Sequence, residues 1–99
     1  MKNLQILETF KLFLQTKDLS AIDFIILGKV AKKPSLIKNI VSDIKVGNSN
    51  ATAMLDKLES RGLIKRVLCA KDRRSIEIEI TRKGTQNLND FLSIDISMY

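Results

Sequence analysis

Histidine and tryptophan are absent from this 99-residue chain, and cysteine occurs once. Without histidine the chain lacks the commonest general base and metal ligand, and a single Cys69 cannot complete a zinc site by itself. We therefore expect no enzyme activity, no metal and no cofactor. One cysteine also excludes a disulfide within the chain, which predicts an intracellular, cytoplasmic protein. Two roles stay open for Cys69: a thiol packed in a strand, or an interface thiol that bridges two copies or acts as a redox trigger.

Long apolar runs are missing as well. The longest, residues 24–27, is far too short to span a bilayer, and residues 1–16 lack a signal-peptide cleavage pattern. The chain has one proline and four glycines, and it shows no internal repeat, low-complexity segment or linker. We therefore expect one domain over residues 1–99 with no membrane role. Its core is small enough that dimerisation would add useful stability.

Positive charge is present in excess, and it is concentrated in one segment. The formal net charge is +6, which favours polyanions as partners. Residues 63–84 contain seven Lys and Arg against three Asp and Glu, whereas residues 85–99 contain two acidic residues and no basic one. The pattern predicts a nucleic-acid-binding surface on the middle segment. The alternative is a cationic surface that is merely solvated.

A helix is predicted over residues 48–61. Its start contains the capping residue types Asn48, Ser49 and Asn50, and Gly62 ends it where a left-handed residue is wanted. Apolar side chains recur at helical spacing along one face, at Ala51, Met54, Leu55 and Leu58. The opposite face carries small or polar side chains that can approach another surface closely.

A β-hairpin is predicted directly after this helix. Residues 63–69 are rich in strand formers, and residues 75–81 alternate strictly, with isoleucines on one face and glutamates on the other. The connection between them has a length that joins antiparallel strands. Three cations lie at its tip: Lys71, Arg73 and Arg74. A hairpin with a cationic tip beside a polar helix face suits the backbone of a DNA duplex.

Two further helices are predicted before this unit. Ser20 and Asp23 indicate a capping-box start for a helix through about Lys32. Its core-facing residues are expected to be Ala21, Phe24, Ile25, Leu27 and Gly28. Pro34 indicates the start of the next helix. The buried stripe of that helix is expected to be Leu36, Ile37, Ile40, Val41 and Ile44. Gly47 then permits the tight turn before the second helix of a helix-turn-helix.

The two terminal helices are predicted to meet another subunit. Residues 1–16 form a helical pattern that is apolar on two faces, so this helix needs two partners. Thr81 caps a C-terminal helix over residues 82–97, whose end is apolar as well. The expected dimer interface consists of Leu4, Leu7, Phe10, Leu14, Phe91 and Ile94. The alternative for the first helix is burial deep in its own domain.

An ordered set of short motifs lies between residues 52 and 84. They are Leu58-Glu59, Gly62-Leu63-Ile64, Arg66, Asp72-Arg73-Arg74, Ile80-Thr81 and Lys83-Gly84. The combination resembles the signature of the multiple-antibiotic-resistance (MarR) regulator family, and it covers about a third of the chain.

The resemblance implies a dimeric winged helix-turn-helix protein, mainly α with a small β-hairpin (α+β), that reads a pseudo-palindromic DNA site. One winged-helix domain would comprise a dimerisation helix (1–16), a helix-turn-helix core (20–62), a wing hairpin (63–81) and a C-terminal helix (82–97). Typical members carry longer C-terminal helices that form the dimer interface and a pocket for small phenolic effectors. Only fifteen residues follow Gly84 here, so we assign no small-molecule effector.

These patterns predict a transcription regulator that binds double-stranded DNA sequence-specifically. The helix over residues 48–61 would lie in the major groove, with contacts from Asn48, Ser49, Asn50, Thr52, Ala53 and Lys57. On the wing, Arg73 and Arg74 would meet the adjacent minor groove. Phosphate contacts are expected from Lys65 and Lys71. The resemblance implies that Asp72 orients a wing arginine, and for Ser49 the alternative role is a helix cap.

The main rival interpretation is a winged-helix module that binds another protein without specific DNA binding. Such a module has no need for three cations at a wing tip, and charge reversal there would leave its partner binding intact. An enzyme is the third and least supported class, because no base, nucleophile pair or metal cluster is visible.

Overall fold

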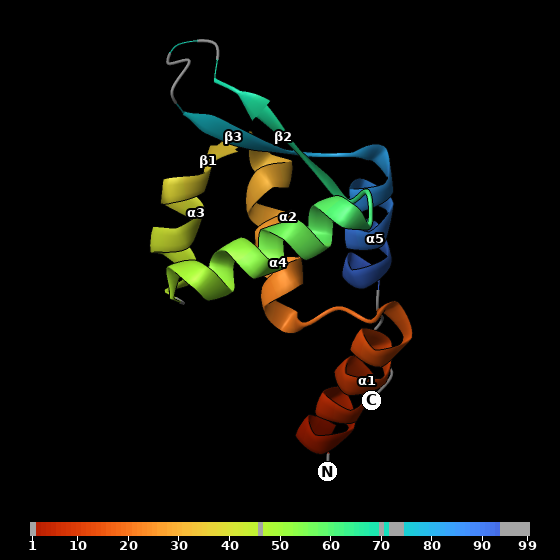
Figure 1. Ribbon diagram of the computed structural model, residues 1–99. Coiled ribbons are helices and arrows are strands. Elements are labelled where there is room, and N and C mark those ends of the chain that lie inside the picture. The colour runs from red at the N-terminus through yellow and green to blue at the C-terminus, as the bar shows by residue number, and fades with distance from the viewer. Residues whose placement is uncertain (1, 46, 70, 72–74, 94–99) are drawn as a thin grey trace.

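Five helices and a small sheet make up the part of the chain that the computed structural model describes, residues 2–45, 47–69, 71 and 75–93. In chain order the elements are α1 (Lys2–Lys17), α2 (Ala21–Lys32), β1 (Ser35–Leu36), α3 (Ile37–Ile44), α4 (Asn48–Ser60), β2 (Ile64–Leu68), β3 (Ile76–Ile80) and α5 (Arg82–Leu92) (Figure 1). The predicted mainly α fold with a β-hairpin is confirmed. Asp72, Arg73, Arg74 and Ile94 lie outside the described residues.

The central helix α2 begins at the predicted capping box. The Asp23 N–H donates to the Ser20 hydroxyl at 3.2 Å, and the Ser20 N–H donates to the Asp23 carboxylate at 2.8 Å. The prediction of its core-facing residues is only partly right. Phe24 and Leu27 are buried with Ile26 and Val30, whereas Ala21 and Ile25 are exposed. Because α2 contacts α3, α5 and β3, it buries more than the one stripe that an amphipathic pattern describes.

The segment after α2 contains a strand that the sequence did not predict. Ser35 and Leu36 form β1, which pairs antiparallel with β3 at Ile78 and Glu77. The prediction that Pro34 starts a helix is therefore wrong, because α3 begins only at Ile37. A proline just before an edge strand removes no ladder hydrogen bond, so Pro34 is compatible with this position.

The turn of the helix-turn-helix also differs from the prediction. The left-handed residue is Lys45, with φ of 55°, whereas Gly47 has φ of −61° and stands at the N-cap position of α4. Ser49 and Asn50 therefore lie inside the first turn of α4, and no side chain caps its start. Prediction of these residues as caps, including the alternative role for Ser49, is wrong.

The end of α4 and the hairpin follow the sequence pattern closely. Gly62 has φ of +75° and terminates the helix as predicted. The strands are ordered β1-β3-β2 in the sheet. β1 therefore pairs with β3, on the edge of β3 that β2 leaves open. In β3 the isoleucines share one face, but Ile78 is fully buried while Ile76, nearer the tip, is 38% exposed.

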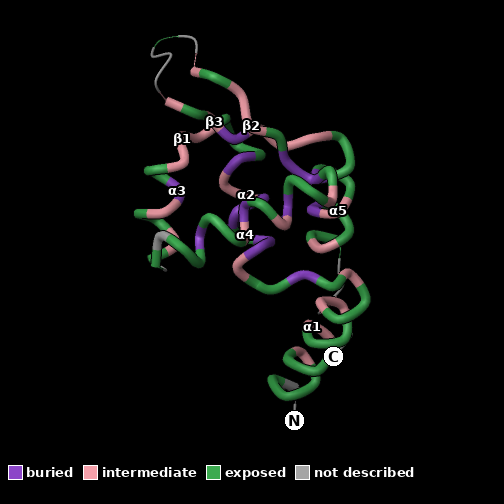
Figure 2. The backbone as a smooth tube through the Cα atoms, in the orientation of Figure 1, coloured by how far each residue is buried: buried purple, intermediate pink, exposed green. Residues whose placement is uncertain are grey.

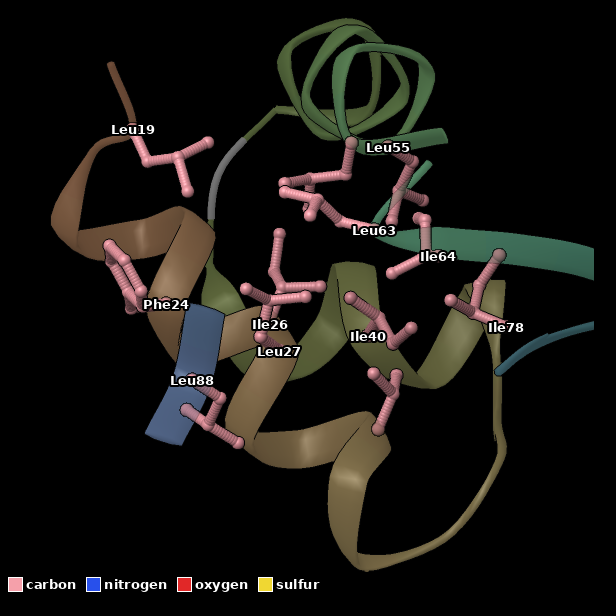
Figure 3. Close-up of a cluster of buried hydrophobic side chains, with 12 residues drawn as sticks. Leu19, Phe24, Ile26, Leu27, Ile40, Leu55, Leu63, Ile64, Ile78 and Leu88 are labelled. Carbon is pink, nitrogen blue, oxygen red and sulfur yellow. The ribbon is translucent and has the colours of Figure 1, made fainter. Parts of the chain in front are cut away.

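A single apolar core joins α2, α3, α4 and the base of the hairpin (Figure 3). Ile26 and Leu27 lie in the same buried cluster as side chains from three other elements: Ile40, Leu55 and Ile78. The predicted stripe of α4 is confirmed, since Ala51, Leu55 and Leu58 are fully buried and Met54 is half-buried. The opposite face of α4 is therefore free to point outward.

The terminal helices pack differently from the core. The Thr81 hydroxyl accepts from the Gly84 N–H at 3.0 Å and caps α5 as predicted. Helix α1 extends away from the body (Figure 1), and its side chains from residue 3 to residue 17 are half-buried or exposed (Figure 2). Phe10 and Phe13 lie with ring centroids 5.7 and 5.9 Å from the ring of Phe91 in α5. The alternative of a first helix buried deep in its own domain does not describe this arrangement.

Candidate nucleic-acid interface

The outward face of α4 presents short side chains near its N-terminal end. Ser49, Asn50, Thr52 and Ala53 are all exposed, whereas the other side of the same helix is fully buried at Ala51 and Leu55. The core therefore fixes which face of α4 points outward. Hydroxyl and amide groups can donate and accept hydrogen bonds, and the methyl group of alanine permits close approach.

Lys57, predicted on the same outward face, is held by a buried carboxylate instead. Its ammonium lies 2.5 Å from Oδ2 of Asp23, a residue with no exposed surface. The second carboxylate oxygen of Asp23 has no hydrogen-bond partner in the described part of the chain. One turn later, Arg61 binds the carbonyl and the carboxylate of Asp18. These contacts anchor the C-terminal end of α4 to the first turn of α2 and to the connection that precedes it.

Arg66 of β2 joins the hairpin to α4. Its guanidinium donates to Asp56 at 2.7 Å and to Glu59 at 2.5 Å, and both carboxylates lie on the outward face of α4. Partial burial lowers the pKa of Arg66, but hydrogen bonds and attraction from the two carboxylates outweigh it and raise the pKa above its ordinary value. Arg66 therefore keeps its positive charge and neutralises two acidic groups beside the candidate interface. We call the contacts of Arg66 with Asp56 and Glu59 the Arg66 clamp.

In the sequence Arg66 stands out only as part of a motif, and its bridging of β2 and α4 was not predicted. Asp56 and Glu59 are three residues apart, which places both carboxylates on one helix face. That spacing was the available signal for the clamp. Asp23 was recognised only as a cap, because nothing local shows that a lysine 34 residues later reaches it.

The described part of the hairpin contains two of the predicted wing residues, Lys65 near the start of β2 and Lys71 beyond its end. Lys65 faces Glu79 across the strands, with 3.4 Å between their charged atoms. Lys71 is exposed, and Asp72, Arg73 and Arg74 lie outside the described residues. The Cys69 N–H donates to the Ser75 carbonyl at 2.9 Å and closes the base of the connection. The Cys69 thiol is free and half-buried, and Cys69 directly follows the end of β2.

A large apolar hollow lies on another side of the molecule. It measures about 1050 Å³, and its walls come from α1, α2 and α5 with Lys57 at one edge. Three of its apolar lining residues are more than half exposed: Leu7, Ile25 and Leu92. Of the predicted dimer residues, Leu4 and Leu7 are exposed, while Phe10, Leu14 and Phe91 are half-buried.

Neither a membrane span nor a metal site is found in the part of the chain that the structure describes. No helix there has the length and apolar character needed to cross a bilayer. No three Cys, Asp or Glu side chains in these residues gather closely enough to hold a metal ion.

Comparisons with known proteins identify related chains. Residues 31–76 match the MarR family. The HTH-type transcriptional regulator PecS of Dickeya dadantii is 36% identical over 75 residues, which are 72% of this chain and 45% of PecS. The chain thus spans less than half the length of this curated relative.

Solved structures show the same fold. The transcriptional regulator BldR from Sulfolobus solfataricus is 32% identical, with a TM-score of 0.71 over 89% of this chain and 72% of BldR. The S. aureus MepR–DNA complex has a TM-score of 0.87 over 97% of this chain and 80% of MepR. At 21% identity, the likeness to MepR shows the fold alone.

Proposed function

Because the chain belongs to the MarR family of transcription regulators, we propose that it regulates transcription by binding double-stranded DNA sequence-specifically. Helix α4 would lie in the major groove and the β2–β3 hairpin would act as a wing at the adjacent minor groove. The observation that carries this proposal is the outward face of α4. It presents short polar side chains beside a hairpin whose connection is rich in cations.

Base and phosphate contacts are proposed for the N-terminal half of α4. The Asn50 amide can pair with an adenine edge, Ser49 and Thr52 can bind phosphates or bases, and Ala53 can contact a thymine methyl group. Asn48 opens the helix and belongs to the same set. Lys57 is not placed among the contacts, because its ammonium lies against the buried Asp23 carboxylate.

The wing is proposed to supply the minor-groove contacts. Arg73 or Arg74 would enter a narrow A·T-rich minor groove, where negative potential is strongest, with Asp72 orienting one of them. Lys71 would bind phosphate. Lys65 would share its charge between Glu79 and phosphate, because its side chain remains 59% exposed beside that carboxylate.

We further propose that two copies associate through the apolar hollow and the exposed leucines of α1. A monomer rarely exposes an apolar patch of this kind without a partner for it. The interface would include Leu4, Leu7, Phe10, Leu14 and Phe91, with Ile94 beyond the described residues. A second copy of this chain is the occupant we assign to the hollow, and we assign no effector. The dimer would function in the cytoplasm.

Binding to random-sequence duplex DNA at several salt concentrations tests the proposed function. The native chain is expected to bind in a salt-sensitive manner. Arg73→Glu/Arg74→Glu is expected to weaken binding at least about 30-fold, because two cations next to phosphates become anions. The matched control is Arg82→Glu/Lys83→Glu, which makes the same charge change on two exposed residues at the start of α5.

The control pair is expected to bind within about threefold of the native chain. A folded native dimer that binds no duplex even at low salt would refute the DNA proposal. That result would favour the rival winged-helix module that binds another protein.

Breaking the Arg66 clamp is expected to weaken DNA binding more than it weakens the fold. Arg66→Met leaves the carboxylates of Asp56 and Glu59 unneutralised on α4, the helix proposed to enter the major groove. It also removes the contacts that join the hairpin to α4. We expect about tenfold weaker binding. We also expect a loss of about 1 kcal/mol in the free energy of unfolding, since the side chains of Asp56 and Glu59 are 62% and 41% exposed. Duplex titration and urea unfolding measure the two effects.

A second variant separates repulsion from positioning. In Arg66→Met/Asp56→Asn/Glu59→Gln the acidic charges are also removed. Recovery of DNA binding would show that repulsion between the two carboxylates and DNA is the main cause of the loss. Binding that stays weak would show that the hairpin must be held against α4. Native affinity in Arg66→Met alone would contradict both explanations.

A further inference from the structure

We propose that Lys38 binds a backbone phosphate of the duplex, and that the hollow it lines between α3, α4 and the hairpin receives the sugar–phosphate strand that separates the two contacted grooves. This inference rests on the proposed function and adds a residue from α3, which supplies none of the DNA contacts proposed above.

The hollow lies between the two elements that are proposed to enter the grooves. It measures about 540 Å³, and its lining includes Leu36, Ile37, Lys38, Val41, Thr52 and Ile76. These residues come from β1, α3, α4 and β3. In Figure 1, α3 runs from the sheet down to the start of α4, so α3 lies between the hairpin and α4.

The position of this hollow matches the path of a duplex backbone. A helix in the major groove and a loop in the neighbouring minor groove have one sugar–phosphate strand between them, because that strand is the shared border of both grooves. A strand that meets α4 on one side and the wing on the other must cross the surface of α3. The mixed lining fits this occupant, since Thr52 offers a hydroxyl to phosphate and Ile76 offers apolar surface to deoxyribose.

Lys38 is the one cation among the described residues that line this hollow. Lys57 and Lys65 have carboxylates within 3.4 Å. Lys38 is exposed and takes part in none of the ion pairs found among the described residues. The one acidic residue of its own helix, Asp43, lies near Lys29 instead, at 3.6 Å. Lys38 therefore offers an uncompensated positive charge at the edge of the hollow.

The salt dependence of duplex binding tests this assignment. Each phosphate neutralised by a protein cation contributes about −0.9 to the slope of log Kobs against log salt concentration. Lys38→Met is expected to reduce the magnitude of the slope by about 0.9 and the affinity at low salt by about three- to tenfold, equally for different sequences. Lys38→Arg is expected to keep the native slope, because it preserves the charge.

Arg82→Met is the matched control. Arg82 is exposed, takes part in none of the ion pairs among the described residues, and starts α5, which lies across α2 from α3 (Figure 1). Its removal is expected to leave the slope unchanged. If the native chain binds and Lys38→Met has the same slope as Arg82→Met, the inference is wrong while the proposed function stands. If the native chain binds no duplex, the proposed function fails first.

Discussion

Gly84→Ala is expected to lower the free energy of unfolding by about 3 kcal/mol or more, the upper end of overpacking effects. Gly84 is buried in the first turn of α5, beside the segment that links α4 to β2. A methyl group there would lie 2.1 Å from the Leu63 carbonyl oxygen and 2.8 Å from a side-chain carbon of Ile80. The closer of these atoms is backbone, so it cannot move aside as a flexible side chain would.

The same carbonyl ties this region together. Leu63 O accepts a hydrogen bond from the Thr81 N–H at 3.1 Å, and the Thr81 hydroxyl caps α5 through the Gly84 N–H. Making room for an alanine would therefore disturb the cap and the start of the hairpin at once. The requirement at Gly84 is space, because its backbone is not among those with positive φ.

Gly28→Ala is the control for Gly84→Ala. Gly28 lies within α2, and an added methyl group would meet no atom within 4 Å. The free energy of unfolding of this variant is expected to be higher by about 0.5–1 kcal/mol, because alanine has a higher helix propensity than glycine. Urea unfolding of both variants measures the difference. A Gly84→Ala chain with the native midpoint would show that α5 packs farther from Leu63 than the structure has it.

Local signals explain which parts of the fold were predictable. The capping box at Ser20 and Asp23 and the cap at Thr81 involve residues three apart, so the sequence contains the whole interaction. Gly62 is equally local, because a glycine at the end of a helical pattern by itself indicates a left-handed backbone conformation. The stripe of α4 repeats often enough to fix which face is buried.

Long-range pairing explains most of what was missed. The two residues of β1 are too few to show alternation, and their partners in β3 lie far along the chain. The left-handed Lys45 carries no glycine or asparagine signal. In α2, exposure of Ile25 was unpredictable because it depends on where α1 and α5 leave the hollow open.

The candidate site was predictable in outline and less so in detail. The outward face of α4 could be predicted, because it lies opposite the apolar stripe of the helix. The partners of its charged residues do not, because they come from α2 and β2. Amphipathic position alone cannot distinguish a lysine that contacts a ligand from one that holds a buried carboxylate. Lys57 is the case in which this distinction changes the proposed contacts.

Lys57→Met is expected to lower the free energy of unfolding by about 3 kcal/mol, the low end for breaking a buried ion pair. Asp23 has no exposed surface, and its Oδ2 accepts from Lys57 at 2.5 Å and from the Ser20 N–H at 2.8 Å. Without the ammonium the carboxylate stays buried with only the capping hydrogen bond. The low end is expected because Lys57 is itself about a third exposed.

Two comparisons isolate the buried charge as the cause. Lys65→Met removes a lysine from the exposed pair with Glu79 and is expected to cost less than about 0.5 kcal/mol. Asp23→Leu/Lys57→Met removes both charges and is expected to regain stability to within about 2 kcal/mol of the native chain, the remainder reflecting the lost cap. Urea unfolding measures all four chains. Equal losses in Lys57→Met and Lys65→Met would show that the contact with Asp23 is no stronger than a surface ion pair. Lys57 would then be free to turn toward DNA.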